Sequence, residues 1–153
     1  MADKTVDKWT KEGKAFKKAL QELGGLEVRV GYQEGATYPD GTPVIQVALW
    51  NELGTVNAPA RPFIRGTVDN NEEKFQKQME SSVKKLANGT TAEKVLNELG
   101  VFAKDLLQQE IKNGEFVPNA PSTIARKGSE KPLIDSGLLR QSANYVIKKK
   151  GGQ

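Results

Sequence analysis

Two short segments with the periodicity of β-strands lie near opposite ends of this chain, and the long stretch between them has helical or irregular patterns. Between residues 26 and 32, apolar side chains alternate with polar or small ones, and a similar alternation returns between residues 144 and 148. A strand of this kind buries one face on a core and leaves the other in water. We therefore expect the two segments to pair antiparallel, which would bring both ends of the chain into one small sheet.

Two segments outside these strands, one before the first strand and one between the two, have apolar residues at the three- and four-residue spacing of an amphipathic helix. The first extends from Val6 to Leu23, and the pair Gly24-Gly25 predicts a left-handed stop after it. The second covers residues 70–87. Its predicted apolar face consists of Phe75, Met79, Val83 and Leu86.

A third long helix has the widest apolar face, and we expect it to form much of the core. It begins with a capping box, Thr90 followed by Glu93, and extends to about Asn113. Gly100 lies in its interior, where glycine costs about 1 kcal/mol relative to alanine, and we attribute it to close packing on a neighbour. The predicted fold class is α+β, with a small antiparallel sheet packed against two or three long helices.

A shorter helix is predicted over residues 43–53. Thr42 can cap it, and the proline at residue 43 suits the first helical position, where its missing N–H costs nothing. The apolar residues of this helix cannot all face one way, so we expect much of it to be buried.

Three further stretches are predicted to be extended or irregular. In residues 55–65, Pro59 and Pro62 favour extended backbone, and we expect this segment to cross or edge the sheet. Residues 34–43 and 115–131 are rich in turn-forming residues and are predicted to be long loops. Such projections have little to do inside a monomer of this size, so we expect them to serve oligomerisation.

The whole chain, residues 1–153, is predicted to form a single domain, which its length allows. After the second long loop, Asp135 or Ser136 is expected to cap a single helical turn that contains Leu138 and Leu139. The predicted parts are an N-terminal helix within 1–25, an α+β core over 26–148 and a flexible basic tail at 149–153.

Several classes of chemistry lack the residues they need. The chain has no cysteine and no histidine, which removes thiolate nucleophiles, cysteine-ligated metals and the commonest general base. No glycine-rich phosphate loop is present. Ser136 lies near Lys131 in the sequence, but these residue types alone do not indicate a catalytic Ser–Lys pair. We predict that the protein is not an enzyme and needs no cofactor or metal. Without a signal sequence or a long apolar run, it is expected to be soluble.

The net charge of +4 comes entirely from the last third of the chain. Residues 101–153 carry 9 basic and 5 acidic side chains, whereas residues 1–50 and residues 51–100 each carry 7 basic and 7 acidic side chains. The basic run Lys148, Lys149 and Lys150 is interpreted as a solubilising terminus. An alternative function, a nucleic-acid-binding module that uses this basic third, stays open.

Three ordered segments give a more specific indication. The first segment joins residues 47–55, which end in Asn-Glu-Leu-Gly-Thr, to the Arg-Pro-Phe stretch within 58–65. The second is residues 121–128, and the third is residues 131–142, which contain the turn Asp-Ser-Gly-Leu-Leu. This order and spacing resembles the tail-completion or neck proteins of long-tailed bacteriophages, including the lambda minor tail protein Z group, over roughly residues 26–148.

The resemblance implies a structural virion protein, assembled in the host cytoplasm, that forms a ring, with sixfold symmetry the natural match to a tail tube. It would complete the tail end and join it to the head. Its expected partners are copies of itself, the tail tube or terminator protein and the head-side connector protein, with possible transient contact with passing DNA and none with a membrane.

The motif segments also supply the candidate interface. In this interpretation the two prolines stiffen the extended segment 55–65, which we call the strip, and Phe63 anchors it. Arg61 and Arg65 pair either with acidic groups across a subunit boundary or with their own helix termini. The candidate subunit or partner interface residues are Asn51, Glu52, Thr55, Pro59, Arg61, Pro62, Phe63, Arg65, Arg126, Lys127 and Lys131.

Overall fold

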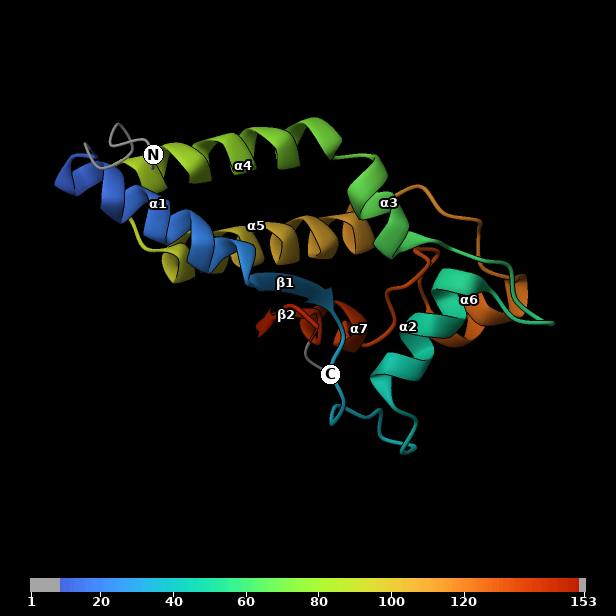
Figure 1. The fold of residues 1–153 in the computed structure, drawn as a ribbon. Helices are drawn as coiled ribbons and strands as arrows, with labels where there is room; N and C mark the ends of the chain where they lie inside the picture. The colour runs from blue at the N-terminus through green and yellow to red at the C-terminus, as the bar shows by residue number, and fades with distance from the viewer. Residues whose placement is uncertain (1–8, 152–153) are drawn as a thin grey trace.

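A computed structural model describes residues 9–151 of the chain and has the predicted α+β architecture (Figure 1). In chain order, its elements are α1 (Lys11–Gly24), β1 (Leu26–Gly31), α2 (Val44–Leu53), α3 (Phe63–Asp69), α4 (Glu72–Ala87), α5 (Ala92–Asn113), α6 (Pro121–Lys127), α7 (Leu138–Gln141) and β2 (Asn144–Lys149). The predicted residues of the first helix before Trp9 lie outside the described residues.

The two strands form one antiparallel sheet, as the alternating segments predicted. Val28 lies opposite Ile147 and Val30 opposite Tyr145 on the face toward α5, whereas Glu27 lies opposite Lys148 on the other face. The basic tail begins later than predicted, because Lys149 belongs to β2 and the next amide, at residue 150, donates to the carbonyl of residue 25.

Helix α5 is the centre of the fold and contacts both strands as well as α1, α3, α4 and α7. Its N-cap is Thr91, whose hydroxyl accepts from the amide of Lys94 at 3.2 Å, rather than the predicted Thr90. The prediction that Gly100 packs closely on a neighbour is confirmed. A Cβ there would overlap the ring of Tyr145.

One end of the molecule is built from α1, α4 and the first turns of α5 (Figure 1). Leu86, Ala92 and Val95 form a small buried cluster there, against which Phe16 and Leu23 pack. Gly25 caps α1 in the right-handed region, at φ −90°, so the predicted left-handed stop does not occur. Met79 and Val83, predicted for the apolar face of α4, are about half exposed.

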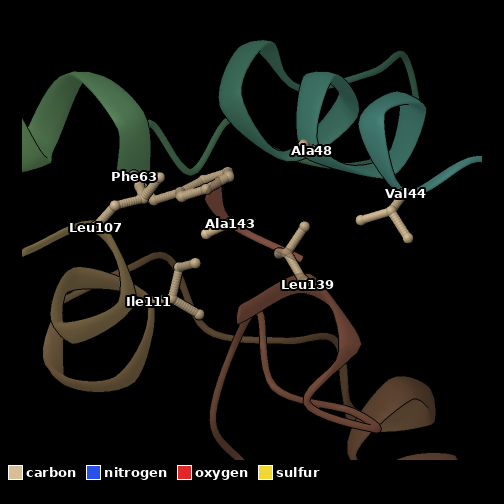
Figure 2. Packing of buried hydrophobic residues seen from close by; sticks show 7 residues of the cluster. All are labelled: Val44, Ala48, Phe63, Leu107, Ile111, Leu139 and Ala143. Carbon is tan, nitrogen blue, oxygen red and sulfur yellow. The ribbon is translucent and has the colours of Figure 1, made fainter. Parts of the chain in front are cut away.

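The main core lies at the other end, where α2, α3, α5 and α7 meet (Figure 2). Phe63 at the start of α3 is fully buried at its centre, and the ring of Tyr32 meets it edge-on at 6.1 Å between centroids. The cluster consists of Val44, Ala48, Phe63, Leu107, Ile111, Leu139 and Ala143.

Two segments predicted to be irregular contain short helices. Residues 63–65 belong to α3, so the extended strip ends at Pro62 and does not join the β1–β2 sheet. The predicted loop 115–131 contains α6, which has Pro121 in its first turn and a left-handed Gly128, with φ 69°, at its end. A proline start and a glycine stop are ordinary helix boundaries, and here they delimit only seven residues.

Helix α2 differs from its prediction in two ways. Pro43 is the N-cap rather than the first helical residue, and Thr42 makes no capping bond. The helix is not largely buried either, because only Val44 and Ala48 are covered. Val47 is half-buried, and the remaining apolar side chains of α2 lie exposed at the surface of the single chain.

Candidate functional site

Helix α2 and the turn after it carry a continuous set of exposed apolar side chains. Ile45, Leu49 and Leu53 follow one another at four-residue spacing, so they share one side of the helix. Leu53 and Val56 are 65% and fully exposed. We call this set the α2 apolar face, and its members are Ile45, Leu49, Leu53 and Val56.

The chain leaves α2 through a tight turn at Gly54. Its φ of 77° favours glycine, and a Cβ there would lie 2.7 Å from the backbone nitrogen of Ala60. Thr55 and Ala58 pair across the turn as an isolated bridge. The strip from residue 55 to Pro62 is thereby fixed beside the end of α2, with Val56 at its tip.

Glu52 holds the next helix in place. Its carboxylate accepts from the amides of Ile64 at 2.8 Å and Arg65 at 3.0 Å, in the first turn of α3. These amides have no partner within the helix, and a carboxylate at a helix N-terminus also interacts favourably with the helix dipole. Glu52 is therefore the cap of α3, supplied from the preceding helix.

Arg61 is buried, with 8% of its surface exposed, and its guanidinium binds its own chain. Nε donates to the carbonyl of Val117 at 2.7 Å and Nη2 to that of Pro118 at 3.1 Å, while its amide donates to the carbonyl of Asn51. Among residues 9–151 the guanidinium contacts neither an acidic group nor the end of a helix, and the predicted pairing with an acidic group across a subunit boundary stays a prediction. Within the single chain, Arg61 ties the strip to the segment that leads into α6.

Between α2, α6 and the turn at residues 38–42 lies an open cavity of about 510 Å³, which we call the α2–α6 pocket. Its walls include the basic side chains of Arg61, Arg126 and Lys127. Trp50 and Leu133 supply apolar wall. Helix α6 contributes no fully buried residue, and its Thr123, Arg126 and Lys127 line one side of the pocket.

The electrostatics of this pocket follow from burial and from a few carboxylates. Burial lowers the pKa of Lys127; nearby Asp135 opposes this effect, and Arg126 and Arg61 add to it. Burial raises the pKa of Tyr38, and Asp135 raises it further. The carboxylate of Asp40 accepts from the amide of Thr42, which lowers its pKa.

The predicted interface residues therefore divide into two groups. Phe63 and Arg61 are buried within their own chain, so these two side chains are not at the surface of the single chain, and their role at an interface stays a prediction. Asn51 and Glu52 are half-buried and make intramolecular bonds. The residues that lie exposed, or half-exposed in the case of Lys127, are Thr55, Pro59, Pro62, Arg65, Arg126, Lys127 and Lys131.

Sequence reasoning missed the α2 apolar face, because it assigned those residues to the interior. One signal was available: six of the ten positions of α2 are large apolar residues, on more than one side of the helix. The α2–α6 pocket had no local signal, since its walls come from five separate stretches of the chain.

Among residues 9–151, no group of three or more acidic side chains is placed to hold a metal ion, and no helix is long and apolar enough to span a bilayer. In comparisons with known proteins, no family model, no curated protein and no solved structure matches this chain. The fold and the two surfaces described above define a small α+β domain with an uncovered apolar face beside a basic pocket.

Proposed function

We propose that the protein is a structural component of a bacteriophage virion, which completes the tail end and joins it to the head connector by forming a ring of six copies. The observation that carries the proposal is the α2 apolar face. Exposed apolar patches of this kind mark protein–protein contacts, and the stiff strip beside it keeps the patch in a fixed position. The ordered motif segments described above agree with this assignment.

The motif residues contribute in two ways. Glu52, Gly54 and Arg61 shape the chain so that the end of α2 and the strip project together. Thr55, Pro59 and Arg65 are left at the surface around the apolar face. A ring needs two different complementary surfaces on each copy, and we propose that the α2 apolar face is one of them.

The test is the molar mass of the full chain, measured by light scattering and native mass spectrometry over a concentration series. We expect a closed oligomer that grows in population with concentration, alone or after addition of the phage tail tube protein. A chain that stays monomeric throughout and binds neither the tail tube nor the connector protein contradicts the proposal.

A matched pair of variants locates the contact. Leu49→Glu places a charge on the α2 apolar face, where the side chain is 55% exposed, and should abolish association while the fold is retained. Val83→Glu changes an equally apolar side chain, 47% exposed, on α4, and should associate like the wild type. Equal loss in both variants would assign the contact elsewhere.

A further inference from the structure

The α2–α6 pocket contains a buried cation without an acidic partner. Arg61 is 8% exposed, yet in the described part of the chain it makes no ion pair, and its guanidinium is held only by two carbonyl oxygens. Buried charges in proteins are normally paired, because desolvation of an unpaired charge is unfavourable. An anion that enters the pocket would supply such a partner.

A second polar group in the same pocket lacks any hydrogen-bond acceptor among the described residues. The side-chain amide nitrogen of Asn119 is buried and has no hydrogen-bond partner among residues 9–151. Buried donors of this kind are few in native structures, and each calls for an explanation. Asn119 lines the pocket together with Arg61 and Arg126, so one acceptor group entering there could serve all three.

The backbone adds an independent observation. Leu133, which also lines the pocket, has φ 63°, and among residues 9–151 it is the only residue other than glycine with a positive φ. Strain of this kind in a non-glycine residue is found preferentially where a binding surface is shaped.

The chemistry of the walls distinguishes among anions. Asp40 and Asp135 lie in the same lining as the basic residues, which disfavours a polyanion such as nucleic acid. Trp50, Val47 and Leu138 provide apolar wall. A single carboxylate matches the planar arginine fork, and an apolar neighbour of that carboxylate matches the walls.

We propose that the α2–α6 pocket binds a carboxylate-bearing peptide segment of a partner protein, with Arg61, Arg126 and Asn119 donating to the carboxylate and Trp50 contacting an adjacent apolar side chain. The inference goes beyond the proposed ring, since the pocket is complete in one chain and requires no second copy.

The experiment is an NMR titration of the full chain with acetyl-Leu-Glu-amide, with acetyl-Leu-Gln-amide as the neutral isostere. The chain has two tryptophans, Trp50 in the pocket and Trp9 at the start of α1, so the second indole is an internal control. We expect saturable shifts of the Trp50 indole and the Asn119 side-chain amide with the glutamyl peptide, none at Trp9, and about tenfold weaker binding of the glutaminyl peptide.

Two exposed arginines provide matched variants that should fold. Arg126→Gln removes a donor from the pocket and should weaken the glutamyl peptide about tenfold, whereas Arg65→Gln lies outside the pocket and should leave it unchanged. A substitution of Arg61 would also release the segment at residues 117–118 that its side chain binds, so it would not test peptide binding alone.

The outcomes separate the proposal from its competitors. No shift at about 10 mM peptide, or equal binding of both peptides, overturns it. Stronger binding of inorganic phosphate or of a single-stranded oligonucleotide at the same resonances also overturns it, and would assign the pocket to phosphate. The titration is repeated on the Leu49→Glu variant, in which association through the α2 apolar face should be lost. Peptide binding to the pocket can then be measured whether or not the ring forms.

Discussion

The ring of Tyr145 on β2 lies directly against Gly100 on α5, in the space that a Cβ at residue 100 would occupy. The hydroxyl of Tyr145 donates to the side-chain oxygen of Asn97, one turn earlier on the same helix, at 3.0 Å. The sheet therefore sits on α5 at a distance that only glycine permits at this position.

Gly100→Ala should destabilise the protein, although alanine is the better helix former by about 1 kcal/mol. The added methyl group displaces the Tyr145 ring and its bond to Asn97, at a net cost of about 1–3 kcal/mol. The free energy of unfolding from urea denaturation measures this loss. Gly24→Ala is the control, because a Cβ there meets nothing within 4 Å and should be neutral or stabilising.

The second prediction concerns the cap of α3. Glu52→Ala leaves the amides of Ile64 and Arg65 without their acceptor and should cost about 1–2 kcal/mol of stability. Glu52→Gln keeps one acceptor oxygen and should lose less. Amide hydrogen exchange at residues 64 and 65 is the second measurement. Unchanged exchange in the alanine variant would mean that the cap contributes nothing.

The main features of the fold could be predicted from local patterns, because each is encoded within one continuous segment. Alternation over residues 26–32 and 144–148 predicted both strands, and only one partner was available for each. The periodicity of α5 was unmistakable over its 22 residues. Even the contact at Gly100 was inferred, since a glycine inside a strong helix calls for a close neighbour.

The rest depended on contacts that no single segment contains. Helix α3 has seven residues, and its cap comes from Glu52 in another helix, so residues 63–65 were assigned to the extended strip. The prediction that much of α2 is buried was wrong, because apolar composition does not distinguish a core helix from a helix with an uncovered face. The bonds of Arg61 reach residues 117 and 118, which lie far along the chain.

A third prediction follows from Tyr32, whose hydroxyl is buried and has no hydrogen-bond partner in residues 9–151. Burial, with a smaller contribution from Tyr38, raises the pKa of Tyr32 above its usual value near 10. The stability linked to this group is therefore complete below about pH 10 and is lost as the pH rises beyond it, at up to about 1.4 kcal/mol per pH unit.

Tyr32→Phe should flatten this alkaline loss and change stability at neutral pH by no more than about 1 kcal/mol, since no bond of the hydroxyl is removed. Thermal or urea unfolding between pH 8 and about 11.5 measures the slope. Tyr38→Phe serves as the comparison. Its hydroxyl pKa is also raised, but the side chain is less buried, so the slope should change less. An identical slope in wild type and Tyr32→Phe would contradict the assignment.

The last prediction separates the structural work of Arg61 from its place in the pocket. Arg61→Met keeps the length and apolar stem of the side chain but removes the donors to the carbonyls of Val117 and Pro118. Because α6 has no buried residue of its own, those bonds are a main tie between it and the fold, and their loss should raise amide exchange across α6 by about tenfold or more. Protection in α5 should be unchanged, since its core packing does not involve the guanidinium. Arg65→Met, an exposed arginine without such bonds, is the control for loss of charge. If α6 exchanged equally in both variants, its position would depend on something other than Arg61, and the basic wall of the pocket would need another explanation.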